Sequence, residues 1–234
     1  MIGVRHRNGR VIHGVGLQRV WVPWRDPSCL CAFDADPGNY VRNGSGVSRW
    51  NDLTGHGYHA LQPTAVNQPT WNENEAIFAG HGSFTCTGSS VRLNIPTLTI
   101  QQPVTVYSVF SKSAGSTGVL LGGDAASAWF AATSGVMALR AGVATIVGPA
   151  VANVNVGYFI LDSTNSVIAN NGTVGTVGNP GTAVINSPNI GGHYIDGYPF
   201  GAKIAALYVF TGAHSLAFRT RISKHLGNKY GVAA

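Results

Sequence analysis

Short stretches of alternating apolar and polar residues, separated by glycine-rich turns, run through most of the chain after residue 27. The clearest is PVTVYSVFSK, residues 103–112, in which successive side chains would point to opposite faces of a strand. About a dozen such stretches, with turns every 8–12 residues, predict a β-sandwich or jelly roll. The hydrophobic pattern therefore indicates an all-β fold.

One stretch near the C-terminus has a helical period instead. Ser215 is a suitable N-cap, and Gly231 follows at a position suited to a C-terminal stop. Between them, apolar or aromatic residues recur every four positions: Phe218, Ile222, Leu226 and Tyr230. The pattern predicts one short helix at the end of the chain.

Composition supports a folded globular chain. Apolar residues make up 44% of the 234 residues and charged residues only 10%, whereas disordered chains need more charge to stay solvated. No run of eighteen apolar residues occurs, so we expect no membrane insertion. The N-terminus lacks the apolar segment and cleavage site of a secretory signal, which predicts a protein made and used, or assembled, in the cytoplasm.

Charge is concentrated at the N-terminus. Residues 1–26 hold +4 of the formal net charge of +6, because they contain five arginines and one aspartate. Prolines at 23 and 27 then interrupt the pattern. These features predict a basic attachment arm over residues 1–27 and a single domain over 28–234, the arm contacting an acidic partner surface through Arg5, Arg7, Arg10 and Arg19.

Three motifs in order carry a family resemblance. CLCAFDADPGNYV, from Cys29, matches an opening of the type L-x-x-W-x-D-A-x at Asp34 and Ala35. GVSRWNDLTGHGYHA, residues 46–60, matches G-V-x-x-W-x-D-x-S-G-x-G-x-x-A, with Thr54 in place of serine. The ending follows a pattern of the type I-G-x…F…I-A-E…K-Y-G at Ile190, Gly191, Phe200, Ile204, Ala205 and Lys229–Gly231, with Ala206 in place of the acid.

With these motifs, residues 28–232 resemble the concanavalin A-like lectin/glucanase jelly roll, in the laminin-G-like form of bacteriophage virion proteins and bacterial surface proteins. The resemblance implies a concanavalin A-like jelly-roll sandwich of two antiparallel sheets with one short C-terminal helix. It also implies that Trp50 is buried and that Asp52 caps the turn that follows, with Gly55 and Gly57 in conformations closed to other residues and His56 and His59 on the loop surface.

Glycosidases of this broad fold use paired carboxylates on one strand. The two glutamates of the chain, Glu73 and Glu75, lie two positions apart in WNENEA and would share a strand face. The residue between them is Asn74 rather than an aspartate, and the stretch is close to a turn. We therefore expect solvated surface carboxylates and no enzymatic activity.

Lectin-like sandwiches often bind Ca²⁺ through loop carboxylates and carbonyls. The nearest such carboxylates are Asp34, Asp36 and Asp52, which are few and unclustered, so we expect no cofactor and leave calcium open. The three cysteines include Cys29 and Cys31, which would share a strand face, and no C-x-x-C pair. They are expected to be buried, reduced thiols.

Sugar binding requires an aromatic platform beside polar groups. The candidates in this sequence are Tyr40, Trp71, Trp129, Tyr194 and Tyr198.

Together these observations predict a non-enzymatic virion protein of a phage or phage-like particle: a capsid decoration, head spike or tail-fibre module. The arm would bind other virion proteins, the assembly would be a homo-oligomer, and host surface polysaccharide is the candidate ligand. Two alternatives stay open at this point, a carbohydrate-binding module of a bacterial surface protein and a glycan hydrolase.

Overall fold

A computed structural model of the chain describes residues 21–112, 117–123, 128–142, 144–193 and 199–234. In these ranges it has nineteen strands, four short 3-10 helices and one α-helix. The strands in the first half are β1 (Cys29–Asp34), β2 (Tyr40–Asn43), β3 (Gly46–Trp50), β4 (Ala60–Leu61), β5 (Thr70–Glu75), β6 (His81–Cys86), β7 (Leu93–Asn94), β8 (Thr99–Ile100) and β9 (Val104–Ser111). Those in the second half are β10 (Gly118–Gly122), β11 (Ala128–Thr133), β12 (Val136–Ala141), β13 (Thr145–Ala150), β14 (Val154–Leu161), β15 (Val167–Asn170), β16 (Thr173–Val174), β17 (Ile185–Asn186), β18 (Asn189–Ile190) and β19 (Ala202–Thr211). The helices are η1 (Pro23–Arg25), η2 (Ala65–Asn67), η3 (Ala76–Phe78), η4 (Ser163–Asn165) and α1 (Leu216–Tyr230).

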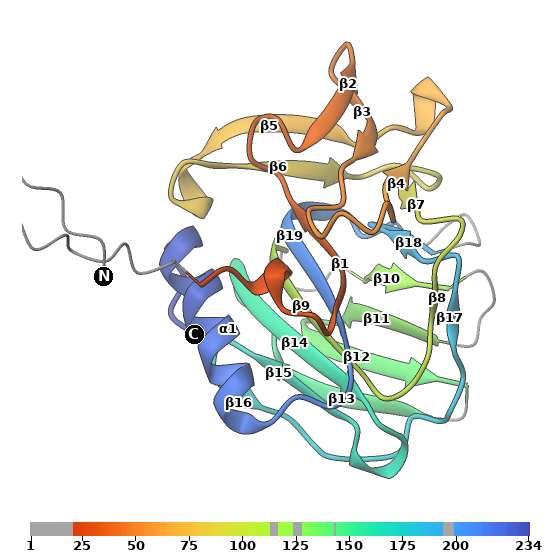
Figure 1. The fold of residues 1–234 in the computed structure, drawn as a ribbon, viewed down its shortest axis with the longest axis vertical. Coiled ribbons are helices and arrows are strands. Elements are labelled where there is room, and N and C mark those ends of the chain that lie inside the picture. The colour runs from red at the N-terminus through yellow and green to blue at the C-terminus, as the bar shows by residue number, and fades with distance from the viewer. Residues whose placement is uncertain (1–20, 113–116, 124–127, 143, 194–198) are drawn as a thin grey trace, which may run out of the picture.

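The strands form two antiparallel layers (Figure 1). In the first, which we call the helix-side sheet, β19 pairs with β1 and β6 on one side and with β9 on the other, followed by β14, β15 and β16. The second sheet runs β4–β7–β18–β10–β11–β12–β13. Strands β5 and β3 join β6 to β4 and so connect the two layers. The expected all-β sandwich is confirmed.

Strand β9 carries apolar residues on both of its faces because both faces are buried. Val106 and Phe110 point into the core between the two sheets, and Tyr107 and Val109 point to the opposite face. Seven of its eight residues are buried because it lies between β14 and β19 and is covered on both faces. The second sheet covers one face of β9, and the C-terminal helix covers the other.

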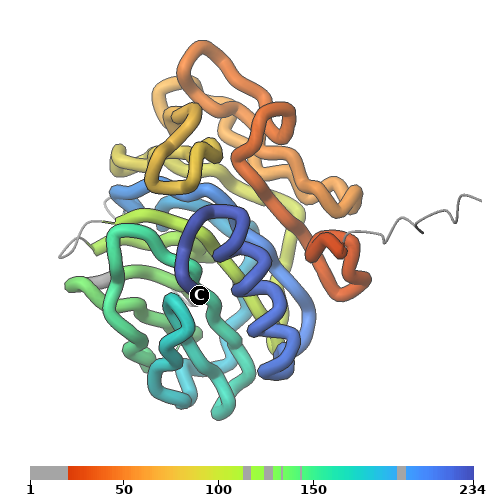
Figure 2. The backbone as a smooth tube through the Cα atoms, turned by 90° about the vertical axis from the view of Figure 1, so that its left-hand side faces the viewer, coloured from red at the N-terminus to blue at the C-terminus, as the bar shows by residue number. Residues whose placement is uncertain are grey.

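Helix α1 lies across the outer face of the helix-side sheet, as Figure 2 shows. Ser215 accepts a hydrogen bond from the Phe218 N–H, and Gly231 ends the helix with φ of 68°. Ile222, Leu226 and Tyr230 are fully buried against the sheet. The predicted helix, its N-cap and its C-terminal glycine are therefore confirmed. Among the described residues, no helix has the length and apolar character of a membrane span.

The loop after β3 covers the outer edge of β1. Trp50 is completely buried, and its Nε1 donates to the carbonyl oxygen of Asp34 at 2.9 Å. Asp52 Oδ1 accepts from the N–H of Ala32 at 3.1 Å, and the same carboxylate accepts from Thr54 and Tyr58 within its own loop. The exposed edge of a strand leaves backbone N–H and C=O groups without hydrogen-bond partners. This loop supplies such partners to β1.

The turn has the expected geometry. Gly55 and Gly57 have φ of 86° and 83°, a left-handed conformation that disfavours other residues. His56 is exposed, whereas His59 is half-buried and its Nδ1 accepts from the Asp52 N–H at 3.1 Å. The interpretation of Trp50, Asp52 and the two glycines is therefore confirmed, and His59 has a structural role that the sequence did not predict.

The expectation that Cys29 and Cys31 share a strand face was wrong. A register shift between Cys29 and Cys31 places these thiols in different cores, Cys29 on the helix side and Cys31 between the sheets. A bulge adds one residue to one strand and so reverses the facing of side chains beyond it. All three cysteines, including Cys86, are buried and free, as expected.

The last residues of the predicted arm pack against the domain. The Trp21 ring contacts Phe218 and His225 of α1, with ring centroids 6.2 and 5.9 Å apart. The Trp24 ring lies 6.0 Å from that of Tyr208 on β19. Residues 21–27 are thus part of the folded body. The arm arginines Arg5, Arg7, Arg10 and Arg19 lie outside the described residues.

Candidate functional site

A cavity of about 260 Å³ opens where the end of β1 meets the β5–β6 hairpin. Its lining combines one large aromatic ring, three ionisable side chains and several backbone surfaces: Trp71, Asp36, Glu73, His81, Pro37, Asn74, Gly80 and Gly82. We call this the Trp71 cavity. Its residues come from three separate parts of the sequence, so only the tertiary fold brings them together.

A bulge in β5 decides which side chains enter the cavity. The pairing of β5 with β6 shifts register between Asn72 and Glu75, and Asn74 has φ of 52°. Trp71 and Glu73 consequently line the cavity, while Glu75 is on the other face, where it forms an ion pair with Lys203 at 2.6 Å. The expectation that Glu73 and Glu75 share a face was wrong, because simple alternation does not continue through a bulge.

Trp71 is held by its neighbours rather than by a hydrogen bond. Its ring centroid lies 5.1 Å from that of Tyr40, and the Arg42 guanidinium carbon is 4.9 Å from the ring centroid. The Nε1 atom is buried without a hydrogen-bond partner. A Cβ at residue 82 would lie 2.4 Å from the Ala35 oxygen and 3.2 Å from Trp71 Nε1, so this wall of the cavity requires glycine.

An ion-pair network supports the opposite wall. Lys229, at the end of α1, contacts Asp34 Oδ2 and lies 2.8 Å from Asp36 Oδ2. His81 Nδ1 is 2.8 Å from Asp36 Oδ1, and the His81 ring packs at 5.0 Å from that of Tyr230. This network fixes the Asp36 and His81 side chains that face the cavity.

The network also sets the charge of its members. Burial alone would raise the pKa of Asp36, but hydrogen bonds from Lys229 and His81 outweigh it and lower that pKa. Burial alone would lower the pKa of Lys229, but the charges of Asp34 and Asp36 raise it. Asp36 is therefore an anion and Lys229 a cation at neutral pH.

Glu73 differs from these residues because it has no hydrogen-bond or ion-pair partner among the described residues. It is exposed at the cavity. Asp36 and Glu73 line the cavity and Asp34 is buried beside Asp36, so three carboxylates stand against two cations, Lys229 and the Arg42 guanidinium on Trp71. The cavity is thus an aromatic surface beside an excess of negative charge.

The structure brings together two of the five aromatic candidates for sugar binding. Tyr40 and Trp71 are in ring contact, and Tyr40 also packs edge-on against Phe84 at 5.4 Å. Trp129 is distant from them in the fold, on β11 of the second sheet, where it pairs with Arg140 and Gly122. Tyr194 and Tyr198 lie outside the described residues. The polar partners Asp36, Glu73 and His81 were not predicted as part of such a site.

The calcium candidates do not form one ligand set. Asp34 and Asp36 both contact Lys229, whereas Asp52 accepts hydrogen bonds from the edge of β1 and from its own loop. In the described part of the chain, no three side chains of the His, Cys, Asp or Glu type are grouped so that they could hold a metal ion.

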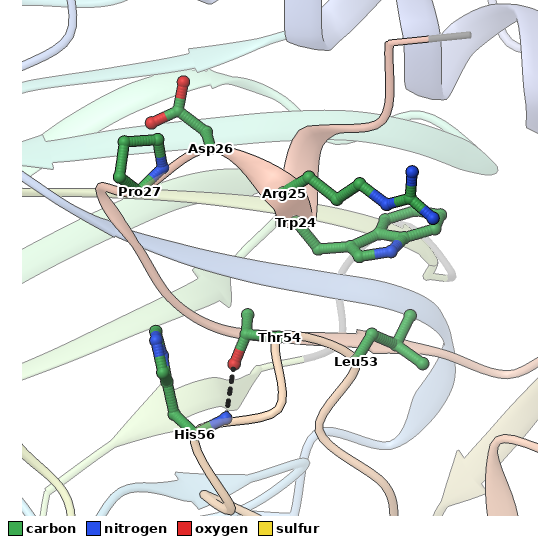
Figure 3. Close-up of a pocket in the computed structure, with 7 residues that line it drawn as sticks. All are labelled: Trp24, Arg25, Asp26, Pro27, Leu53, Thr54 and His56. Atoms are coloured by element: carbon green, nitrogen blue, oxygen red, sulfur yellow. Dashed lines mark hydrogen bonds between the residues drawn. The ribbon is translucent and has the colours of Figure 1, made fainter. Parts of the chain in front are cut away.

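A second cavity, of about 380 Å³, lies between residues 24–27 and the loop after Trp50 (Figure 3). Several of its polar groups already have protein partners. Asp26 accepts from Ser28, Thr54 donates to Asp52, and His56 Nδ1 is 3.0 Å from the Leu30 oxygen. The Trp71 cavity, with its aromatic face and unpartnered glutamate, is the better candidate for a ligand site.

Comparison with solved structures identifies the same fold in carbohydrate-active proteins. Domain 4 of AbnA, a GH43 extracellular arabinanase from Geobacillus stearothermophilus solved with arabinotriose, matches 87% of this chain and 98% of its own, with a TM-score of 0.58 and 14% identity. An arabinofuranosidase complexed with arabinofuranosyl-alpha-1,2-xylobiose matches 81% of this chain and 52% of its own, with a TM-score of 0.62 and 10% identity. A Trypanosoma rangeli sialidase in complex with sialic acid matches 85% of this chain and 33% of its own, with a TM-score of 0.58 and 13% identity.

Comparison of the sequence alone gives no relative: no protein-family model and no curated protein matches it. The chain spans about a third of the sialidase and half of the arabinofuranosidase, so it corresponds to one domain of each. At these identities the similarity shows the fold alone. The chain is an all-β sandwich of the type found as a domain in carbohydrate-binding and glycan-processing proteins.

Proposed function

We propose that this domain binds glycans without cleaving them, and that the Trp71 cavity is the binding site. The observation that carries the proposal is the juxtaposition of a half-buried indole ring with Asp36, Glu73 and His81 around one cavity. A sugar ring has an apolar C–H face that packs on an aromatic ring and hydroxyls that donate to carboxylates. The Trp71 cavity offers both kinds of contact.

The solved structures support this proposal at the level of the fold. Three of them are described with a bound sugar, either an arabinose-containing oligosaccharide or sialic acid. Those ligands belong to those proteins. For this chain they favour carbohydrate as the class of ligand.

The arrangement of carboxylates supports binding rather than hydrolysis. A retaining or inverting glycosidase needs one carboxylic acid that donates a proton and a second, ionised carboxylate opposite it. Glu75 lies on the other face of β5 and is paired with Lys203. Asp36, with its lowered pKa, stays ionised and is unsuited to donate a proton at neutral pH.

Glycan retention by purified protein tests the site. Wild-type protein should bind a subset of immobilised bacterial surface polysaccharides, and Trp71→Ala should weaken that binding about tenfold or more, because an aromatic anchor is lost. Trp129→Ala is the matched control and should bind as wild type. Loss of binding in Trp129→Ala with retention in Trp71→Ala would place the site on the second sheet instead.

Release of reducing ends tests the absence of catalysis. Incubation of the protein with a polysaccharide that it binds should release none over a day. Release that disappears in Glu73→Gln would show that the Trp71 cavity is an active site.

We further propose that the domain is displayed on a phage or phage-like particle as a homo-oligomer, with residues 1–20 binding other virion proteins. The support is the concentration of positive charge at the N-terminus and the resemblance of the three sequence motifs to the jelly-roll form of virion proteins. Immunogold labelling of purified particles is the test. Particles without label, from cells that express the protein, would contradict it.

A further inference from the structure

We infer that the Trp71 cavity selects glycans that carry protonated amines, that is, amino sugars without an N-acetyl group, over N-acetylated and anionic glycans. This inference rests on the proposed function and names its ligand class.

Negative charge predominates around the cavity. Asp34 and Asp36 share Lys229, Asp36 also contacts His81, and Glu73 has no partner among the described residues. Against these three carboxylates stand two full cations, Lys229 and the Arg42 guanidinium on Trp71, so one negative charge is in excess. Such a lining attracts a cationic ligand and repels sialic acid or uronic acid residues.

The aromatic surface of the cavity also favours a cationic ligand. The indole ring of tryptophan is the side chain that attracts cations most strongly, and exposed cation–π contacts contribute about 0.5–1 kcal/mol. In this structure Arg42 already places its guanidinium over Trp71, 4.9 Å from the ring centroid. The ring surface thus already accepts a cation that belongs to the chain itself.

Arg42 is also free to leave. Its side chain is exposed, and it has no hydrogen bond or ion pair among the described residues, only the contact with Trp71. A ligand ammonium that approaches Trp71 and Glu73 would take the place of this guanidinium. Arg42 is therefore a competitor of an amine ligand, whereas it would be a partner of an anionic one.

Calorimetric titration distinguishes these possibilities. The probes are a glucosamine tetramer, the matching N-acetylglucosamine tetramer and sialyllactose, at about pH 6, where such amines are protonated. Wild-type protein should bind the glucosamine tetramer about tenfold more tightly than the N-acetylated one, and sialyllactose least. Added salt should reduce the difference.

Three variants complete the test. Glu73→Gln should remove most of the preference for the amine, while Glu75→Gln, the same change on the opposite face of β5, should leave it unchanged. Arg42→Ala should strengthen binding of the glucosamine tetramer. Weaker binding in Arg42→Ala, or equal or tighter binding of sialyllactose by wild type, would overturn the inference.

The amine preference and the proposed glycan binding can be contradicted by different results. If glycans bind and Trp71→Ala abolishes their binding but no amine preference exists, only the selectivity is wrong. If no probe or immobilised polysaccharide binds, both statements are wrong. Unchanged melting temperatures of the variants would exclude misfolding as the cause of any loss.

Discussion

Trp50 occupies the centre of the aromatic cluster between the sheets, 5.3 Å from the Phe33 ring and 4.6 Å from the Phe84 ring. Trp50→Ala should lower the free energy of unfolding by about 3–5 kcal/mol, since a large cavity forms and the Asp34 carbonyl loses its donor. Urea denaturation measures the change. Trp71→Ala is the comparison and should cost less because Trp71 is only half-buried. Equal losses would contradict this account of the core.

His214 contributes to the pH dependence of stability, together with His193 and His225, whose pKa values burial also lowers. Burial lowers its pKa from 6.5 to about 4, and the ring packs 4.2 Å from that of Phe218 while Nδ1 is 2.9 Å from Tyr107 Oη. Between these two pKa values the unfolded chain binds more protons than the folded one. The free energy of unfolding should therefore be retained above about pH 6.5 and fall as the pH drops toward 4.

Urea midpoints at neutral pH and near pH 4 measure this effect. His214→Gln should show a smaller decrease than wild type, because its contribution to proton uptake is gone. His56→Gln, on the exposed loop, should keep the full decrease. An identical decrease in wild type and His214→Gln would assign the acid sensitivity to other groups.

At the scale of elements, the end of α1 is joined to the end of β1 by charge. The Asp34 side chain is 2% exposed and that of Lys229 19%. Lys229→Met should cost about 3–5 kcal/mol, because it leaves a buried carboxylate without a counter-ion, and Asp34→Asn in the same chain should restore part of the loss. Denaturant unfolding of the two single variants and the double variant measures the coupling.

The pair Lys203–Glu75 is the matched control for this prediction. It has the same chemistry but the Lys203 side chain is 33% exposed. Lys203→Met should therefore cost about 1 kcal/mol or less. Similar losses in the two lysine variants would show that the pair at the end of α1 is not specially important for stability.

At the scale of the whole molecule, the folded body includes Trp21 and Trp24. Deletion of residues 1–20 should leave the melting temperature within about 2 °C of wild type, whereas deletion of residues 1–26 should lower it by about 4 °C or more, because the contacts of Trp21 and Trp24 with α1 and β19 are lost. Under the proposed attachment role, both truncated proteins should fail to join the particle. Normal incorporation of the shorter deletion would exclude that role, and equal melting temperatures would show that the contacts of Trp21 and Trp24 add no stability.

The structural features that depend on residues close together in the sequence could be predicted from it. The strands, the helix with its Ser215 cap, and the roles of Trp50 and Asp52 follow from side-chain period, capping and turn chemistry, which act over a few residues. Trp71 and Tyr40 were recognised as aromatic candidates by residue type. Their contact with each other was not, because strands β2 and β5 meet only through β3.

The sequence by itself thus determined an all-β chain with a basic N-terminus, one C-terminal helix and a glycine-rich loop after Trp50. Only the tertiary structure decided that the Glu73 side chain lines a cavity while the Glu75 side chain lies on the other face of β5. The bulge at Asn74 that separates them arises from pairing with β6 rather than from the β5 sequence pattern. Only the tertiary structure brought together Asp36, His81 and Lys229, which lie on three distant segments. Charges so far apart in the chain interact only after the sandwich has formed and α1 has packed against it.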